Sequence, residues 1–305
     1  MKNLNLEAYK NQTDYNGWVR FFLDNGFIQP DMTILDIGGA TGNFLEMINQ
    51  EICSIKGTVL ETDMDCIRWG REHYPHIQFI HGRFPNEVWE KDATSPDKFD
   101  VVTMQSLFPH LSDWKVSIRE MVRLAKQYIN FSAIVRLNGA TIADSDISYF
   151  YYMNTGERVS QVILNIWEIF NFLCIEEMRV KKIFFHGTHN FSSNFEQKIE
   201  EMIKEKNIPI ETVVVDVGDQ MHAFRGVPFY EQVTGNFTIE LFDKESNPKR
   251  MGGFSGHKQA GKEKEYEFFM PDIISYIDGY EFYAVEKQEK RYNLYHLIKA
   301  MRKEM

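Results

Sequence analysis

The stretch 34–45, ILDIGGATGNFL, constrains the fold of this chain more than any other part of it. A short apolar run that contains Asp36 leads into a turn built on Gly38, Gly39 and Gly42, and the turn leads into the apolar start of a helix. This order predicts a ligand pocket at the end of a parallel strand. Glycine lets a ligand approach the backbone closely, and the first turn of the helix offers free N–H groups.

The acidic residue before the glycine turn narrows the choice of ligand. In dinucleotide-binding folds the glycine turn faces a pyrophosphate, which a carboxylate at the position of Asp36 would repel. The ligand should therefore carry a positive group at this place. S-adenosylmethionine fits, because it has an ammonium and a sulfonium group and no phosphate.

A second acidic residue supports the same pocket. The segment 57–61 reads as an apolar strand that ends in Glu61, followed by Thr62. Glu61 comes about 20 residues after the glycine turn, which is the spacing at which a carboxylate reaches ribose hydroxyls in βαβ nucleotide folds. One carboxylate can accept from both hydroxyls, so Glu61 favours a ribose without a phosphate.

The order of elements predicts an α/β fold with a doubly wound, mostly parallel sheet. A leading helix is expected over 14–28, with Gly26 as its stop. The strands and helices that should follow alternate up to residue 139. Strands are expected at 33–37, 57–61, 77–80, 99–104 and 128–136, and helices at 42–50, 64–73 and 112–126.

These residues resemble the class I S-adenosylmethionine-dependent methyltransferases over about residues 15–140. Asp36, Gly38 and Gly42 match the D-x-G-x-x-x-G frame of the family's first motif, and Glu61 matches its acidic ribose ligand. The family often has a glycine where this chain has Ala40, a departure that alanine should tolerate. The resemblance implies a Rossmann-like sheet of seven strands and S-adenosylmethionine as the cofactor.

The third strand departs further from the family. Many members carry an aspartate that bonds the adenine amino group, where this chain has Arg83. Adenine is therefore expected to be held by backbone groups, with Phe84 as a stacking wall. Tyr9, Tyr15 and Trp18 could close over the cofactor. The predicted cofactor-binding residues are Asp36, Gly38, Gly39, Gly42, Glu61, Thr62, Arg83, Phe84 and Gln105.

His110 is the candidate catalytic residue, as the general base that takes the acceptor's proton. It follows the fourth predicted strand, at the ligand end of the sheet, and imidazole titrates near neutral pH. The alternative is a structural histidine that packs or caps the next helix. No metal site is predicted. His186 and His189, and Asp216, Asp219 and His222, could ligate a divalent ion, but neither spacing is diagnostic, and ordinary polar loop residues are the preferred interpretation.

The C-terminal half has more material than the closing strand pair of such a sheet needs. A helix is expected over 157–175, strands at 180–185, 211–217, 237–242 and 280–285, and helices at 193–206 and 292–303. The predicted domains are a cofactor-binding core, 1–190, and an α+β extension, 191–305. The extension should complete the sheet and form a substrate lid or an association surface, the latter giving a homodimer. The aromatic run 149–152, with Trp167, could form a wall for a ring-shaped acceptor or pack in the core.

Composition limits the partners. The net charge of −10 disfavours nucleic acids and anionic membranes, which attract basic surfaces. No apolar run has the roughly 20 residues of a spanning helix, and no signal peptide is visible. Three cysteines far apart fit a reduced, cytoplasmic setting.

The sequence predicts an enzyme that transfers a methyl group to a small molecule or sugar, with a hydroxyl as the acceptor, in polysaccharide or natural-product biosynthesis. The N/D-P-P-Y/F run of the family's nucleic-acid amino-methyltransferases is absent after the fourth strand. Two alternatives stay open: an NAD-dependent oxidoreductase or epimerase, and a non-catalytic protein that binds S-adenosylmethionine.

Overall fold

The structure is a computed structural model of the chain. The residues that it describes are 6, 9–10, 16–52, 54–85, 99–105, 107–137, 139–144, 148–152, 158–176, 179–189, 212–217, 220–225, 232–242 and 272–277.

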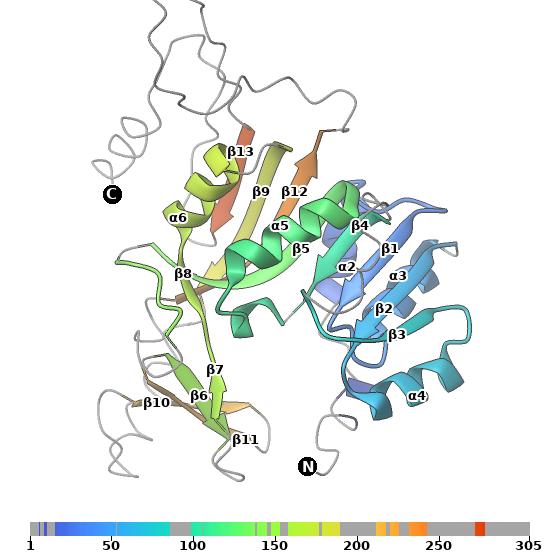
Figure 1. The fold of residues 1–305 in the computed structure, drawn as a ribbon, viewed down its shortest axis with the longest axis horizontal. Coiled ribbons are helices and arrows are strands. Elements are labelled where there is room, and N and C mark those ends of the chain that lie inside the picture. The colour runs from blue at the N-terminus through green and yellow to red at the C-terminus, as the bar shows by residue number, and fades with distance from the viewer. Residues whose placement is uncertain are drawn as a thin grey trace, which may run out of the picture.

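A nine-stranded mixed sheet forms the centre of the described structure, in the order β13-β9-β12-β5-β4-β1-β2-β3, with β8 also paired to β5 (Figure 1). Strands β1 to β5 run parallel, and β12 runs antiparallel to both of its neighbours. The strands are β1 Thr33–Ile37, β2 Lys56–Glu61, β3 Gln78–His81, β4 Phe99–Met104, β5 Ala125–Arg136, β8 Ile163–Asn165, β9 Val180–His189, β12 Gln232–Leu241 and β13 Asp272–Ile277.

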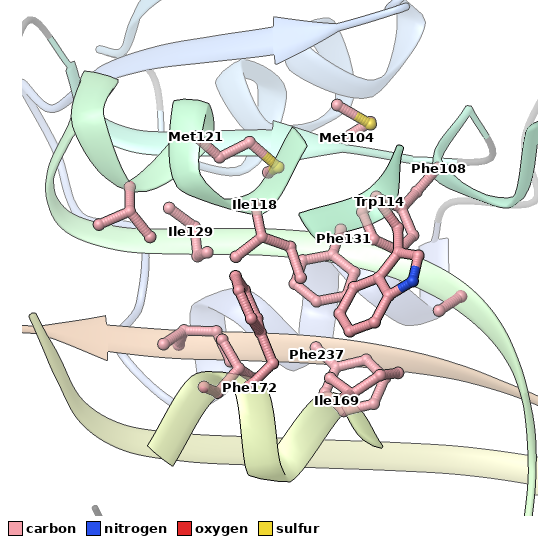
Figure 2. Packing of buried hydrophobic residues seen from close by; sticks show 14 of the residues in the cluster. Met104, Phe108, Trp114, Ile118, Met121, Ile129, Phe131, Ile169, Phe172 and Phe237 are labelled. Atoms are coloured by element: carbon pink, nitrogen blue, oxygen red, sulfur yellow. The ribbon is translucent and has the colours of Figure 1, made fainter. Parts of the chain in front are cut away.

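Helices cover both faces of this sheet. Helix α5 and the segment from α6 into η3 pack on one face in the larger apolar cluster (Figure 2), and α2, α3 and α4 contribute to a second cluster on the other face. The helices are α2 Asn16–Asp24, α3 Asn43–Ile52, α4 Met64–His73, η2 Phe108–His110, α5 Trp114–Leu124, α6 Ile166–Asn171 and the π-helical η3 Phe172–Glu176. No helix within the described ranges is both long and apolar enough to cross a membrane.

A second, four-stranded antiparallel sheet has the order β10-β11-β6-β7. Its strands are β6 Tyr149–Tyr152, β7 Arg158–Ser160, β10 Thr212–Val217 and β11 Gln220–Arg225. Strand β5 extends beyond the end of β4, and β8 pairs with that extension at Ile134 to Arg136. The small sheet therefore lies on the side of the main sheet where the carboxyl end of β4 is found (Figure 1).

The predicted fold class is confirmed, and the first five predicted strands lie within three residues of the observed ones. The main sheet is larger than the predicted seven strands because β8 and β13 join it. Strands β6, β11 and β13 were not predicted. The predicted helix 193–206, strand 280–285 and helix 292–303 lie outside the described residues.

The predicted helix over 157–175 is wrong in its first half. That half forms β7 and β8, and the α-helix begins only at Ile166. The side chain of Asn165 accepts hydrogen bonds from the backbone N–H groups of Trp167, at 2.9 Å, and Glu168, at 3.2 Å. Asn165 is thus the N-cap, and it fixes the start of the helix.

The division at residue 190 stays a prediction. Strand β12, from the predicted extension, lies between β5 and β9 of the predicted core. Strands β10 and β11 of that extension pair in turn with β6 of the core. The two predicted pieces therefore share both sheets.

Candidate functional site

The glycine turn after β1 requires glycine at its first position. Gly38 has φ +70°, a conformation that residues with a side chain rarely adopt, and its N–H donates to Leu60 O at 2.8 Å. A Cβ atom there would lie 2.8 Å from Leu107 Cδ2. The turn closes where Gly42 N–H donates to Gly39 O at 2.8 Å, just before α3 begins.

Asp36 is buried in β1, with 1% of its surface exposed. A Cβ atom on Gly39 would lie 2.5 Å from Asp36 Oδ2, so only glycine leaves room for this carboxyl group. Asp36 Oδ1 receives no hydrogen bond from any residue that the structure describes. Burial raises the pKa of Asp36 well above its usual range, and the negative charge of Glu61 raises it further. A cation bound beside Asp36 would stabilise its ionised form, as the ammonium group of S-adenosylmethionine would.

Glu61 ends β2 beside the same turn. Its Oε1 accepts from Thr62 N at 2.6 Å, Thr62 Oγ1 at 3.1 Å and Asp63 N at 2.9 Å, and its Oε2 accepts from Ala40 N at 3.0 Å. These bonds fix the carboxylate between the second strand and the glycine turn. Ala40 is held by this contact at φ +47°, in the left-handed region where a side chain is strained.

Replacing Ala40 by glycine should raise the free energy of unfolding by about 1 kcal/mol, because it removes the strain at a position where glycine is favoured. Urea denaturation measures this change. Ala133→Gly in the buried strand β5 is the control, and it should lower the same quantity by about 1 kcal/mol or more. Equal effects of the two substitutions would contradict a strained backbone at Ala40.

The other predicted cofactor residues differ in how much of their surface is exposed. Thr62 bonds to Glu61, and Arg83 is exposed after β3. Phe84 is 6% exposed and belongs to the larger apolar cluster. Gln105 is buried directly after β4. The stacking role of Phe84 stays a prediction, and its burial shows that most of its surface contacts the core.

His110 lies in η2, in the loop after β4, and is half-buried. Its Nδ1 lies 2.7 Å from Ser160 O in β7. A carbonyl can only accept, so Nδ1 carries the proton, and in the neutral ring the lone pair is on Nε2. Burial lowers the pKa of His110, and the hydrogen bond to Ser160 opposes this only in part. A neutral imidazole with a defined acceptor nitrogen is suited to accept a proton.

The N-terminal segment contacts the glycine turn through the backbone oxygen of Tyr9. Thr41 Oγ1 donates to Tyr9 O at 3.1 Å, and Asn43 Nδ2 donates to the same oxygen. Asn43 Oδ1 in turn accepts from the Tyr74 hydroxyl at 2.8 Å. Tyr9, named above as a group that could close over the cofactor, is therefore held beside the turn.

Among the described residues, no group of three or more His, Cys, Asp or Glu is suited to a metal ion. His186 stacks on Phe21, with ring centroids 5.9 Å apart. Asp216 lies in β10 opposite Met221, and His222 lies in β11 opposite Val215. Asp219 lies outside the described residues.

Comparison with known proteins shows which families this chain is similar to. A family model described as a methyltransferase domain matches residues 8–132, which include the glycine turn, Glu61 and His110. The matched stretch, which is less than half of the chain, is therefore similar to a methyltransferase domain. It contains every predicted cofactor-binding residue, and β12 and β13 lie beyond it.

Among curated proteins, the ubiquinone/menaquinone biosynthesis C-methyltransferase of Xanthomonas oryzae pv. oryzae is 24% identical over 115 residues, which are 37% of this chain and 45% of that protein. The matched stretch is therefore less than half of the curated relative.

Two solved methyltransferase structures also align with the chain. Coclaurine N-methyltransferase, bound to N-methylheliamine and S-adenosylhomocysteine, is 9% identical, with a TM-score of 0.49, over 79% of this chain and 81% of that one. The 1,6-didemethyltoxoflavin-N1-methyltransferase of Burkholderia thailandensis is 9% identical, with a TM-score of 0.42, over 78% and 82%.

Proposed function

We propose that this protein transfers the methyl group of S-adenosylmethionine to a hydroxyl of a small molecule or sugar unit, in polysaccharide or natural-product biosynthesis. The observation that carries the cofactor part of the proposal is the buried carboxyl of Asp36, which has an oxygen without a hydrogen bond from the described residues, beside the glycine turn. When bound, S-adenosylmethionine supplies a methyl carbon that is already activated by its sulfonium leaving group.

The residues of this chain would bind and orient the two reactants. Asp36 would pair with the ammonium group of the cofactor, and Glu61 would accept hydrogen bonds from its ribose hydroxyls. The turn at Gly38 would let the cofactor lie directly on the backbone. Because the reaction is an in-line displacement, holding the acceptor oxygen in line with the methyl carbon provides much of the rate enhancement.

His110 would remove the proton of the acceptor hydroxyl through Nε2. The hydrogen bond from Nδ1 to Ser160 supports this role, because it fixes both the tautomer and the orientation of the imidazole. The lowered pKa keeps the imidazole neutral, and therefore able to accept a proton, at pH 7.

The rate of methyl transfer should rise with pH up to the pKa of His110 and should not fall again above it. Below the lowered pKa of His110 the imidazole is protonated, and the rate should fall about tenfold for each pH unit. Above that pKa the rate should be constant. His110→Gln should remove this step from a profile of kcat/KM between pH 4.5 and 8.5. A step that is unchanged in the variant would assign the titration to another group.

Calorimetry tests the cofactor site without knowledge of the acceptor. Wild-type protein should bind S-adenosylmethionine and S-adenosylhomocysteine with micromolar affinity. Glu61→Ala should weaken both at least about tenfold, which corresponds to about 1.4 kcal/mol. NAD is the control ligand. If neither S-adenosylmethionine nor S-adenosylhomocysteine binds, or if NAD binds more tightly, the proposed function is wrong. The alternative of an NAD-dependent oxidoreductase or epimerase would then be tested next.

Candidate acceptors separate an enzyme from a protein that only binds the cofactor. A panel of sugar, phenol and amine acceptors would be incubated with the protein, and formation of S-adenosylhomocysteine would be measured. Turnover on a hydroxyl acceptor is the expected result. Turnover on amines alone would contradict the hydroxyl assignment.

A further inference from the structure

Three buried side-chain amides form a closed cycle of hydrogen bonds, here called the amide triad (Gln105, Asn130 and Asn236). Gln105 Nε2 donates to Asn130 Oδ1, Asn130 Nδ2 donates to Asn236 Oδ1, and Asn236 Nδ2 donates to Gln105 Oε1 at 3.1 Å. The three residues are 6%, 1% and 1% exposed, so water does not compete for these bonds. The amide triad joins the loop after β4 to β5 and β12.

The direction of the cycle is fixed by the backbone. Asn130 Nδ2 also donates to Phe237 O at 3.0 Å, and a carbonyl can only accept. Asn130 therefore has one possible amide orientation, and the orientations of the other two amides follow from it. Gln105 uses its remaining hydrogen on Thr103 Oγ1 at 2.9 Å, so both of its donors are engaged inside the protein.

Gln105 begins the short turn that leads to His110. Leu107 N–H donates to Gln105 O at 2.8 Å, and His110 N–H donates to Leu107 O at 2.9 Å. The side chain of Leu107 lies directly against Gly38 of the cofactor turn. A change in the position of Gln105 would therefore move both Leu107, which lies against the glycine turn, and His110, the candidate base.

The opposite face of the sheet holds the same turn through aromatic rings. Phe108 packs on Phe131 with ring centroids 4.4 Å apart, and Phe131 stacks on Phe237 at 5.1 Å (Figure 2). Phe131 and Phe237 follow Asn130 and Asn236 in the chain, so side chains alternate between the two faces. The amide triad thus fixes the start of the turn, and the aromatic column fixes its middle.

We propose that Asn236 is a positioning residue for methyl transfer, which acts through Asn130 and Gln105 to fix Leu107 and His110 beside the glycine turn. This inference rests on the proposed function. It assigns a role in the reaction to β12, which lies beyond the stretch that matches the methyltransferase domain. An apolar core would serve stability equally well, whereas directed hydrogen bonds fix one position of the turn.

A matched pair of substitutions in β12 tests the proposal. Asn236→Leu removes one member of the amide triad, and Thr238→Val is the control. Both replace a polar side chain that is 1% exposed by an apolar one of similar shape, and Phe237 separates them. Thr238 Oγ1 accepts from Asn130 Nδ2 at 2.8 Å but is not a member of the cycle, so the control leaves the three hydrogen bonds of the cycle in place. Circular dichroism would first establish that each variant is folded.

Two readouts distinguish positioning from stability. In Asn236→Leu the Kd of S-adenosylmethionine should rise about fivefold, as for the loss of one ordinary hydrogen bond, and the pKa of His110, measured by NMR, should move up toward its ordinary value. Thr238→Val should change the Kd by less than about twofold and leave the pKa of His110 in place. If Asn236→Leu does not fold, Asn236→Asp replaces it, since aspartate cannot donate to Gln105 Oε1.

Equal behaviour of the Asn236 and Thr238 variants in both readouts would overturn the proposal. Failure of the proposed function has a different signature, because then the wild-type protein itself would not bind S-adenosylmethionine. The His110 titration would still decide whether Asn236 fixes the turn in that case, since it needs no cofactor.

Discussion

Asp36→Asn is expected to weaken binding of S-adenosylmethionine about a hundredfold and to stabilise the protein without ligand. The loss in affinity follows because the ligand's ammonium group would lose a buried carboxylate partner, worth about 3 kcal/mol. Calorimetry measures the first effect and thermal unfolding at pH 7.5 the second. Wild-type affinity in this variant would show that Asp36 does not receive the ammonium group.

The gain in stability follows from the raised pKa of Asp36. In the unfolded chain this carboxyl loses its proton near pH 4, whereas in the folded protein it keeps it to higher pH. The free energy of unfolding should therefore fall as the pH rises from about 4 through the raised pKa. Asparagine does not titrate, so the variant avoids this loss. Over the same pH range the wild-type affinity for the cofactor should increase, because the ionised carboxylate is the form that binds.

Asp100 provides the matched control on the neighbouring strand β4. It accepts from Thr33 N and Thr33 Oγ1, both at 2.7 Å, and lies near Lys126. Burial pulls the pKa of Asp100 upward, but these partners outweigh burial and leave the pKa below its usual value. Asp100→Asn should therefore lower thermal stability at pH 7.5 and leave cofactor binding unchanged. Opposite signs for the two variants would establish the assignment.

Arg179→Met is expected to lower the free energy of unfolding by about 3 kcal/mol, with no direct effect on the cofactor site. The guanidinium group is buried and donates to the backbone carbonyls of Val122, Ala125, Lys126 and Phe242, at 2.8 to 3.3 Å. It thereby satisfies the end of α5 and ties β9 to it. Methionine keeps the apolar stem but leaves these carbonyls without a donor.

Arg123→Met in α5 is the control for this prediction. Arg123 pairs with Glu120 one turn earlier in the helix, and such partly exposed pairs contribute about 0.5 kcal/mol or less. Guanidinium chloride denaturation of both variants gives the comparison. A cost for Arg179→Met no larger than that of the control would mean that water replaces the guanidinium group at no penalty.

The first half of the fold could be predicted because its signals are local. Strand β1 was predicted with its observed bounds, and Gly26, predicted as the stop of the first helix, has φ +69° just after α2. Asp36, the glycine turn and Glu61 lie together because neighbouring parallel strands bring their carboxyl ends to the same side of the sheet. Spacing along the chain was sufficient there.

The error over 157–175 has a local cause. The apolar residues from Val162 to Leu173 have helical spacing, but the same residues also suit a short buried strand followed by a helix. The N-cap signal of Asn165 with Glu168 was present in the sequence and would have separated the two. Periodicity alone did not.

The amide triad could not be predicted from the sequence. Asn236 lies 131 residues from Gln105 and 106 from Asn130, and no local pattern indicates that the three side chains meet. Their meeting depends on the register of β12 against β5, which pairs Thr238 with Asn130. Arg179 is similar, since its partners come from α5 and from Phe242. Such contacts belong to the tertiary structure.

The central place of β12 has a consequence for biosynthesis. Strands β5 and β9 both pair with β12, yet the ribosome completes them before residue 232 is made. Until then each of the two strands has an unpaired edge, and such edges are prone to intermolecular pairing. Pairing β5 with a strand about 100 residues later also closes a long loop, which slows folding. Nascent chains that stall before β12 should therefore be the form of this protein that most needs chaperones.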